Sequence, residues 1–455
     1  MNKIAFCGAS GNGISPLEQI MIKKGYEVYG SDLSFDEGRD QDRKKALQNV
    51  GLHTIPQDGS GITPDMKALY VSSIINEENP DVQAARKYGI PIKKRSDLLC
   101  EIFSQYEKGI AIGGTAGKTT TTAMIGYILD TLGYRPCMIN GGMLCNYQNN
   151  PGMPNYLYYD NSKYCVIEAD ESDGSIQKYH PYIGIINNIS HDHTSMEKLI
   201  EYFTNFATHV QHALIINKDC PVGSQIKAPT AQTLSFSMKD ASADFYASNI
   251  RAIKDGVEYQ LDGQTFRLGI IGTFNIANAL AAIAACSAAG INKFDAAKAL
   301  EGFTGVKVRL EKIGTSANDI TIYNDFAHNP GKLAASISAL KEHPGRIIAM
   351  YQPHTPFSVT NTRDEMAPAF VSVLEQNDIL IMQEIYELTP NDNISSNDII
   401  NDVKQLGHSN ATFFKTRLPL KEFILQNAKK GDRIIIMGAH DNSLADFSRE
   451  LLSLL

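Results

Sequence analysis

The sequence predicts an α/β protein of three domains, each built on a parallel sheet covered by helices. At about 150 residues per domain, a chain of 455 residues suggests three domains. Short apolar runs alternate with helical stretches, as in doubly wound sheets. Two of these runs lead directly into glycine-rich turns, after residues 4–7 and after residues 110–112. We expect Rossmann-like first and third domains and a phosphate-loop domain between them.

Composition excludes several classes of protein. Hydrophobic residues make up 43% and charged residues 20%, both in the globular range. A formal charge of -8 without a long basic run argues against nucleic acid as a partner. No signal peptide or membrane span is predicted, because no uncharged apolar stretch is long enough. The seven cysteines include no Cys-x-x-Cys pair, which favours free thiols in a reducing cytoplasm.

The first predicted domain covers residues 1–107, with strands at 4–7, 27–30, 68–72 and 90–92. The run Gly8-Ala9-Ser10-Gly11-Asn12-Gly13 follows the first strand and opens a helix, and Asp32 closes the next strand. Such a loop suits a diphosphate, and an acidic residue about 20 positions later suits a ribose hydroxyl. The pattern does not distinguish a dinucleotide from another nucleotide diphosphate.

The second predicted domain covers residues 108–307 and contains the strongest single motif. Gly113-Gly114-Thr115-Ala116-Gly117-Lys118-Thr119-Thr120 lies between an apolar strand and a helix-like stretch at 121–129. Glycines turn backbone N–H groups toward phosphate oxygens, and the helix N-terminus adds its positive end. Lys118 would reach the β and γ phosphates, and the Thr119 hydroxyl would ligate Mg²⁺. Ile112 stands where the general motif has its first glycine, so the loop is a shortened variant.

Further strands of this domain, at 164–167, 183–186 and 213–216, each end in polar residues. Four carboxylates follow the first of them, at Glu168, Asp170, Glu171 and Asp173, and would repel one another without a cation. We expect Glu168, the first beyond the apolar run, to be the Mg²⁺ ligand. His193, after the next strand, would ligate a second Mg²⁺ or orient the ligands of the first. Residues 235–268 are expected to form a small antiparallel appendage, and 275–289 an alanine-rich helix.

The third predicted domain covers residues 308–455, with strands at 320–323, 346–351, 378–382 and 433–437.

Two nucleotide-type loops in one chain suggest that one holds a nucleotide-tagged substrate while the other holds the ATP that activates it. A nicotinamide-dependent oxidoreductase would leave the second loop without a purpose. A nucleotide-binding regulator without catalysis is the other alternative.

These motifs together resemble the Mur ligases, and the resemblance extends over nearly the whole chain. It rests on the first loop, Gly8 to Ser15; on Tyr70-Val71-Ser72-Ser73-Ile74-Ile75 with Asn79-Pro80; on Gly114 to Thr120; on Glu168 to Asp173; on Asn188-Ile189 with Asp192-His193; on Gly272 to Leu280; on Arg309 with Glu311; and on Asp325-Phe326-Ala327-His328-Asn329-Pro330. Such ligases join an amino acid or peptide to the carboxylate of a UDP-linked sugar in peptidoglycan precursor synthesis.

The resemblance implies roles for individual residues. The sugar nucleotide would meet the first loop and its neighbours, namely Gly8, Ser10, Gly11, Gly13, Ser15, Asp32, Ser72 and Ser73. ATP would meet Gly114, Thr115, Gly117, Lys118, Thr119, Thr120, Asn275, Asn278, Arg309 and Asp325, with Mg²⁺ at Thr119, Glu168 and His193. Lys118, Glu168, His193 and Arg309 would carry catalysis. Since Arg309 and Asp325 lie on another predicted domain than Lys118, we expect the third domain to close on ATP.

The pattern is most similar to the branch that adds L-alanine to UDP-N-acetylmuramate, with three departures. Ala116 replaces a usual His or Asn, and Thr355 follows His354 where an arginine is usual. The fork of an arginine grips a carboxylate and threonine cannot replace it, so Arg363 would take that role, beside His328 and His354. The segment 325–330 looks more like later members of the family. A murein peptide ligase, which attaches a recycled peptide to the same sugar nucleotide, is the nearest alternative.

Overall fold

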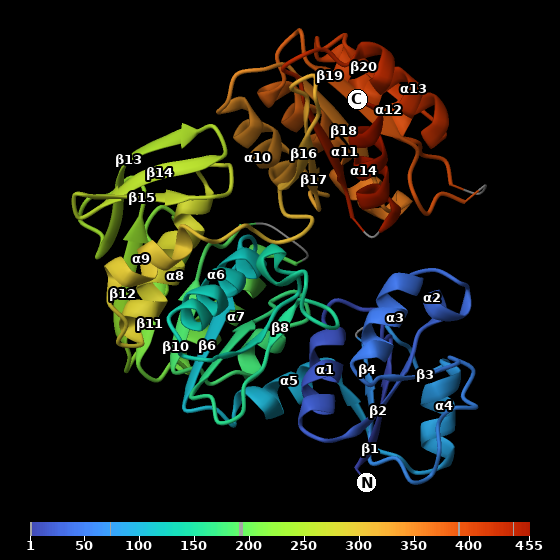
Figure 1. The fold of residues 1–455 in the computed structure, drawn as a ribbon, viewed down its shortest axis with the longest axis vertical. Helices are drawn as coiled ribbons and strands as arrows, with labels where there is room; N and C mark the ends of the chain where they lie inside the picture. The colour runs from blue at the N-terminus through green and yellow to red at the C-terminus, as the bar shows by residue number, and fades with distance from the viewer. Residues whose placement is uncertain (1, 73, 191–193, 390–391, 440) are drawn as a thin grey trace. The chain divides into compact units, whose positions relative to one another are not determined.

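The computed structural model describes residues 2–72, 74–190, 194–389, 392–439 and 441–455. The chain forms two compact units (Figure 1). The first contains Met1–Ile250, Glu258–Gly269 and Asn275–Val306. The second contains Arg251–Val257, Ile270–Phe274 and Lys307–Leu455. Among the described helices, none is both long and apolar enough to cross a membrane.

The N-terminal part of the first unit is a five-stranded sheet in the order β3-β2-β1-β4-β5, with every pair parallel. Residues along a strand point alternately to its two faces. Ile4 and Phe6 therefore pack into one core cluster, and Ala5 and Cys7 into another. The strands are β1 (Lys3–Cys7), β2 (Glu27–Ser31), β3 (His53–Ile55), β4 (Leu69–Val71) and β5 (Ile92–Lys94), and the helices are α1 (Ser15–Lys23), α2 (Leu33–Asp36), α3 (Gln41–Asn49), α4 (Pro80–Lys87) and α5 (Arg95–Phe103).

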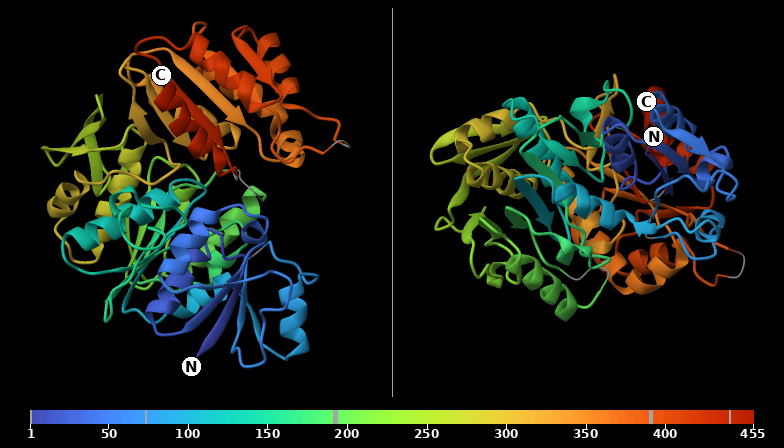
Figure 2. Two further views of the ribbon diagram at one scale, coloured as in Figure 1. Left: turned by 45° about the vertical axis from the view of Figure 1, so that its right-hand side comes forward. Right: turned by 90° about the horizontal axis from the view of Figure 1, so that it is seen from below.

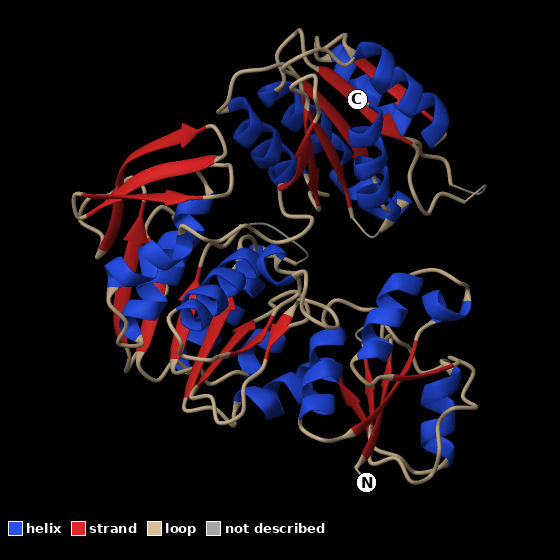
Figure 3. Ribbon diagram, in the orientation of Figure 1, coloured by secondary structure: helices blue, strands red, loops and turns tan. Residues whose placement is uncertain are grey.

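The middle of the chain forms a ten-stranded sheet in the order β15-β14-β13-β12-β11-β10-β6-β9-β7-β8. Figure 3 distinguishes the strands in red from the helices in blue. Its strands are β6 (Lys108–Gly113), β7 (Cys137–Ile139), β8 (Tyr156–Leu157), β9 (Tyr164–Glu168), β10 (Ile183–Ile186), β11 (Ala213–Asn217), β12 (Gln232–Ser237), β13 (Phe245–Ile253), β14 (Gly256–Leu261) and β15 (Gln264–Leu268). Its helices are α6 (Lys118–Thr131), α7 (Met196–Thr208), α8 (Asn275–Ala288) and α9 (Lys293–Leu300), with short 3-10 turns at Cys145–Tyr147, Ser175–Lys178 and Gly223–Gln225.

The first two sheets belong to one unit because helix α5 is apolar toward the middle sheet. Leu99 and Phe103 of α5 share a core cluster with Ile167 and Tyr179. The Phe103 and Tyr179 rings meet edge to face, with centroids 5.8 Å apart. Burial of such large side chains is the main favourable term that holds these two sheets together.

The second unit is a six-stranded sheet in the order β16-β17-β21-β18-β19-β20, parallel except for β16, which pairs antiparallel with β17. Figure 2 draws this sheet in orange to red. Alternate residues of β18 enter two separate cores, as expected for a sheet covered on both faces. The strands are β16 (Glu311–Thr315), β17 (Thr321–Asp325), β18 (Ile347–Gln352), β19 (Ile379–Gln383), β20 (Ala411–Phe414) and β21 (Arg433–Gly438), and the helices are α10 (Pro330–Lys341), α11 (Pro356–Val373), α12 (Ser396–Gln405), α13 (Arg417–Asn427) and α14 (Ser443–Leu454).

The predicted α/β class is confirmed, with three sheets. Five strands were not predicted, β3, β7, β8, β16 and β20, which are short or only partly buried. The strand predicted at 90–92 instead spans Ile92–Lys94. The prediction that residues 235–268 form a small antiparallel appendage is wrong in one respect. Strands β12 and β13 pair in parallel and continue the main sheet, because β12 adds directly to β11.

Candidate active site

The phosphate loop connects strand β6 to helix α6. Ile110, Ala111 and Ile112 are fully buried, so the strand end that carries the loop is fixed by the core. The helix begins at Lys118, directly after Gly117. Gly117 has φ +83, and a Cβ there would lie 2.3 Å from Asn278 Oδ1. Only glycine fits this position, because a side chain would meet both backbone strain and a buried amide.

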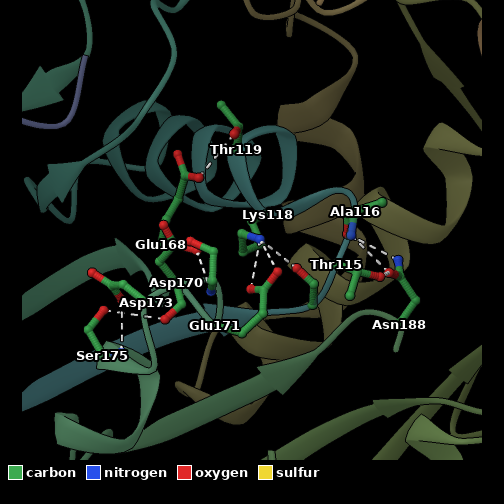
Figure 4. A network of polar contacts seen from close by, with 12 residues as sticks. Thr115, Ala116, Lys118, Thr119, Glu168, Asp170, Glu171, Asp173, Ser175 and Asn188 are labelled. Carbon is green, nitrogen blue, oxygen red and sulfur yellow. Dashed lines mark hydrogen bonds and ion pairs between the residues drawn. The ribbon is translucent and has the colours of Figure 1, made fainter. Parts of the chain in front are cut away.

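The Lys118 side chain folds back over the loop (Figure 4). Its Nζ donates to the Gly114 carbonyl at 2.7 Å and to the two Glu171 carboxylate oxygens at 2.9 and 2.8 Å. Only 2% of the Glu171 side chain is exposed. Burial raises the pKa of Glu171, although Lys118 opposes this. Glu171 is thus the carboxylate that contacts the lysine, a role that the sequence did not distinguish from those of its acidic neighbours.

Glu168, at the end of β9, faces the first turn of α6. Its Oε2 accepts a hydrogen bond from Thr119 Oγ at 3.0 Å, and its other oxygen accepts one from the Gly141 N–H. Nearby, burial opposes ionisation of Asp170, but Lys118, the Ser172 N–H and Arg95 together hold its pKa below the ordinary value. The Thr119 hydroxyl and the Glu168 carboxylate place two oxygen donors side by side, and oxygen donors are what Mg²⁺ prefers. The residues present therefore fit the expected metal.

Asn188 forms hydrogen bonds with Thr115 and Ala116 of the phosphate loop. It was not among the predicted site residues. Its Oδ1 accepts from the Ala116 N–H at 2.9 Å and from Thr115 Oγ at 2.8 Å, and its Nδ2 donates to the Ala116 carbonyl at 3.0 Å (Figure 4). Asn188 follows β10, which is the strand next to β6. The sequence could have indicated Asn188, because the residue comes just after a buried strand that lies next to the strand carrying the phosphate loop. The backbone of Ala116 is thus fixed by Asn188.

The two asparagines expected near the adenine base lie at the start of α8. Asn278 Nδ2 donates to Asn275 Oδ1 at 3.0 Å, and Asn278 Oδ1 accepts from Thr121 Oγ at 3.3 Å. Both asparagines are almost fully buried. Asn278 therefore packs behind Gly117 and links α8 to α6. Thr120 follows on the first turn of α6, where it is partly exposed.

Most N–H groups of the first glycine loop donate to carbonyl or carboxylate oxygens of the protein itself. Those of Gly8 and Ala9 donate to the Ser31 carbonyl, and those of Gly11 and Ser15 donate to the Gly8 and Gly11 carbonyls. The Ser10 N–H donates to Asp32 Oδ2 at 2.8 Å.

In this structure the N–H groups of Gly8, Ser10 and Gly11 are thus engaged with other parts of the protein. Asp32 also caps helix α2, since its Oδ1 accepts from the Ser34 N–H at 2.9 Å and from Ser34 Oγ at 2.7 Å. Its carboxylate is thus engaged in shaping the loop and the helix start.

A cavity of about 300 Å³ lies between the first loop and the phosphate-loop domain. Ser72 and Gly13 line it from the N-terminal sheet, and Gly141, Glu168 and Asp170 line it from the middle sheet. The structure thereby brings two predicted sets together, the diphosphate loop and the proposed metal ligand, although they come from different sheets. Further residues that line the cavity are Gly11, Asn12, Ile14, Pro16, Arg95, Leu99, Ile139 and Asn140.

A buried amide pair fixes the first loop against the middle sheet. Asn155 Nδ2 donates to the Asn12 carbonyl at 3.2 Å and to Ser15 Oγ at 2.9 Å. Gln19 of α1 accepts from the Met153 N–H at 2.8 Å. Asn155 and Gln19 are 0% and 1% exposed. Such satisfied buried amides specify one geometry, because an unpaired partner would cost free energy.

In the second unit, Arg309 stands between two residues with left-handed backbone, Val308 at φ 56 and Leu310 at φ 51. This region is unusual for a β-branched residue, and such strain is concentrated at functional sites. Side-chain carboxylates hold the segment: Glu311 Oε2 accepts from the Val308 N–H at 2.8 Å, and Asp325 Oδ1 accepts from the Leu310 N–H at 3.0 Å. The Arg309 guanidinium lies over the Phe326 ring, 4.7 Å from its centroid.

Asp325, expected to anchor ATP, is buried at the end of β17. Its other oxygen accepts from the Ser336 hydroxyl, and burial raises its pKa. In this structure the carboxylate orders the Arg309 segment.

The residues expected at the amino-acid subsite lie near the carboxyl ends of the same sheet or on α11. His328 Nδ1 is 2.9 Å from the Phe326 carbonyl, and His354 Nε2 is 3.1 Å from Glu387 Oε1. Arg363 forms a two-point contact with Asp402, Nε to Oδ2 at 2.8 Å and Nη2 to Oδ1 at 3.2 Å. A substrate carboxylate would have to displace Asp402 from this fork. Thr355 caps α11 by accepting the Ser358 N–H at 3.1 Å.

Two predicted site residues, Ser73 and His193, lie outside the described residues. Among the residues that are described, no group of three or more His, Cys, Asp or Glu side chains could by itself hold a metal. The seven cysteines are free, as predicted.

Comparisons with known proteins agree with this geometry. Three family models match: the Mur ligase family catalytic domain over residues 3–107, the Mur ligase middle domain over 112–286, and the Mur ligase glutamate ligase domain over 308–440. A UDP-N-acetylmuramate–L-alanine ligase of Acaryochloris marina is 32% identical over 96% of this chain and 93% of its own length. One from Thermosynechococcus vestitus is 33% identical over 95% of this chain and 92% of its own length.

Solved structures share the fold. The UDP-N-acetylmuramate-alanine ligase of Thermotoga maritima superposes with a TM-score of 0.83 at 22% identity, covering 100% of this chain and 99% of that one. A murein peptide ligase of Psychrobacter arcticus gives a TM-score of 0.71 at 22% identity, covering 100% of this chain and 98% of its own. With all three domain models matched in order, and with relatives above 30% identity over nearly the whole length, the chain belongs to the Mur ligase family.

Proposed function

We propose that this chain is an ATP-dependent ligase that forms an amide bond between the carboxylate of UDP-N-acetylmuramate and L-alanine. The observation that carries the proposal is the cavity that the first glycine loop shares with Glu168, which accepts a hydrogen bond from Thr119 of the phosphate loop. A sugar nucleotide held there would present its carboxylate toward the end of an ATP molecule on the Lys118 loop. The names of the relatives support L-alanine as the amine. We also propose domain boundaries at 107/108 and 307/308, and a cytoplasmic location.

The reaction would proceed in two steps. A carboxylate oxygen of the sugar nucleotide attacks the γ phosphorus of ATP, the bond to the β-γ bridging oxygen breaks, and ADP leaves with that electron pair. The amine of L-alanine then attacks the acyl phosphate carbon, loses a proton, and releases inorganic phosphate as the amide forms. Phosphorylation is needed because a free carboxylate oxygen is a poor leaving group.

The residues would act mainly by position and charge. Lys118 would exchange Glu171 for the β and γ phosphate oxygens and balance their charge, and Arg309 would add a second cation. Thr119 and Glu168 would hold Mg²⁺, with His193 as a further candidate. When bound, Mg²⁺ neutralises phosphate charge and fixes phosphate geometry. Asn275 and Asn278 would border the adenine base.

The test is phosphate release by the purified full chain with ATP, Mg²⁺, UDP-N-acetylmuramate and a panel of amines. We expect release only when all substrates are present, and fastest with L-alanine. Release with a recycled tripeptide but not with L-alanine would instead identify a murein peptide ligase. If no amine leads to phosphate release, the result would support the alternative of a nucleotide-binding regulator without catalysis. The panel includes glycine and L-serine, since a pocket selects weakly against one small group.

A further inference from the structure

One arginine of the second unit connects the carboxyl ends of three neighbouring strands, β21, β18 and β19. Arg417 is the first residue of α13. Its Nη2 donates to Gln352 Oε1 at 3.0 Å, and its Nε donates to Gln383 Oε1 at 3.0 Å, at the last residues of β18 and β19. Nη2 also donates to Asp441 Oδ2 at 2.8 Å, and Nη1 donates to Ser443 Oγ at 2.7 Å, after the end of β21. A single guanidinium therefore fixes these three strand ends relative to one another.

The chain changes sides of the sheet between β18 and β21. Helix α11, which follows β18, packs into one core through Met366 and Phe370. Helix α14, which follows β21, packs into the other core through Leu444 and Phe447. In open α/β sheets, ligands bind outside the carboxyl ends of the strands at such a switch point. The hydrogen bonds of Arg417 thus lie at the edge of the sheet where a substrate is expected.

These hydrogen bonds reach His354, a residue expected at the amino-acid subsite, through Gln352. Gln352 is 4% exposed, and its Nε2 donates to the Glu384 carbonyl at 3.2 Å. Two residues later, the His354 carbonyl accepts the Glu387 N–H at 2.9 Å, and His354 Nε2 is 3.1 Å from Glu387 Oε1. The loops after β18 and β19 are thus joined both at their bases and at His354. A shift of Gln352 would move the imidazole, and Arg417 is the side chain that opposes this shift.

Arg417 acts through these loops and does not grip a substrate itself. Its guanidinium already forms four hydrogen bonds, and the side chain of Asp441, one of its partners, is only 4% exposed. A substrate carboxylate would meet the negative charge of Asp441 there. Arginine suits the task because its planar fork directs donors to several acceptors at once, whereas lysine is a point charge.

We propose that Arg417 is a positioning residue of the amine subsite, which holds the loops after β18, β19 and β21 so that His354 meets the incoming amine. This inference rests on the proposed function and names the group that orders its amine subsite. The partners of Arg417 include no residue expected at ATP or at the sugar nucleotide. The defect of an Arg417 variant should therefore be confined to the amine.

The same sheet contains a matched control at its opposite edge. Arg346 comes just before β18, and its Nε and Nη2 lie 3.1 and 2.6 Å from the carboxylate oxygens of Asp432, just before β21. The side chains of this pair are 17% and 4% exposed, against 25% and 4% for Arg417 and Asp441. Substitution of either arginine thus breaks a similarly buried ion pair, but only Arg417 lies at the carboxyl edge.

The test is steady-state phosphate release by the full-length protein with ATP, Mg²⁺, UDP-N-acetylmuramate and the amine that the wild type uses fastest. Arg417→Gln removes the charge, and Arg417→Lys keeps the charge but removes the fork. Arg417→Gln/Asp441→Asn removes both charges, so that no buried carboxylate is left unpaired. Arg346→Gln is the control. Circular dichroism and the melting temperature verify the fold of each variant.

We expect the KM for the amine to rise about 10-fold or more in Arg417→Gln and in the double variant, and less in Arg417→Lys. The KM values for ATP and UDP-N-acetylmuramate should stay within about twofold of the wild type. Arg346→Gln should lower the melting temperature about as much as Arg417→Gln does and leave all three KM values unchanged. The double variant should regain part of the melting temperature but none of the amine affinity.

A wild-type KM for the amine in the double variant would overturn this inference, and so would an equal rise of that KM in Arg346→Gln. Either result would leave the proposed function standing. A wild-type protein whose phosphate release does not depend on the sugar nucleotide and an amine would overturn the proposed function and this inference with it.

Discussion

Lys118 and Glu171 form a buried ion pair across 53 residues of sequence, with Nζ 2.9 and 2.8 Å from the two carboxylate oxygens. The pair links the phosphate loop to the acidic segment after β9. It also means that the lysine has a partner before any nucleotide binds. ATP must therefore compete with Glu171 for Lys118.

Lys118→Ala should abolish substrate-dependent phosphate release, by at least about 100-fold, because phosphoryl charge loses its main cation. It should also destabilise the protein by about 3 kcal/mol at neutral pH, since Glu171 is left as an unpaired buried charge. Burial already raises the pKa of Glu171 above 4.5, and removal of the lysine raises it further.

The stability gap between wild type and Lys118→Ala should thus be small below pH 4.5 and widen as Glu171 ionises at higher pH. Urea unfolding across this pH range measures the gap. The double variant Lys118→Ala/Glu171→Gln should recover most of the lost stability but none of the activity. A gap that does not depend on pH would contradict the pairing.

Glu168→Gln and Glu171→Gln separate the two candidate metal carboxylates. If Glu168 holds Mg²⁺ with Thr119, its glutamine variant should need about 10-fold more Mg²⁺ for half-maximal turnover. Glu171→Gln should change the Mg²⁺ requirement less and should instead lower the KM for ATP, because Lys118 no longer has a competing carboxylate. Titration of Mg²⁺ and ATP in the phosphate-release assay measures both. The reverse pattern would move the ligand assignment from Glu168 to Glu171.

Asn155→Ala should loosen the first glycine loop. The substitution leaves the Ser15 hydroxyl without its buried partner and removes one of the hydrogen bonds of Gln19, so we expect a loss of about 1–3 kcal/mol of stability. The KM for the sugar nucleotide should rise several-fold while the KM for ATP stays within about twofold. Asn146→Ala, at a partly exposed asparagine of the same domain, controls for a general effect of removing an amide. An equal rise in both KM values would indicate a global change instead of a local one.

Glu18→Gln should stabilise the protein at neutral pH. Glu18 is fully buried on α1, and neither carboxylate oxygen has a hydrogen-bond partner among the described residues. Burial, with a further contribution from Asp32, raises the pKa of Glu18 well above 4.5. A raised carboxyl pKa means that the folded state binds the proton more tightly, so this group loses stability as pH rises above 4.5. The melting-temperature difference between Glu18→Gln and wild type should therefore grow from pH 4.5 to pH 8, and a constant difference would contradict the assignment.

Much of the fold was predictable because its signals are local. Apolar runs such as residues 183–186 read as buried strands without any tertiary information, and Gly113 to Thr120 marked the phosphate loop by its own spacing. Strands β3 and β16 escaped prediction because they contain few buried residues and so lack that signal, and β7, although buried, has only three residues.

The sequence by itself determined the α/β class, the two glycine-rich loops and the side chains that follow each strand. Tertiary structure decided which of four neighbouring carboxylates meets Lys118 and that Asn188 holds Ala116. It also decided that the N–H groups of Gly8 and Ser10 donate to Ser31 and Asp32. The physical reason is distance along the chain: a hydrogen bond between residues 53 or 72 positions apart depends on how strands are ordered in a sheet. No local pattern of residues contains that order.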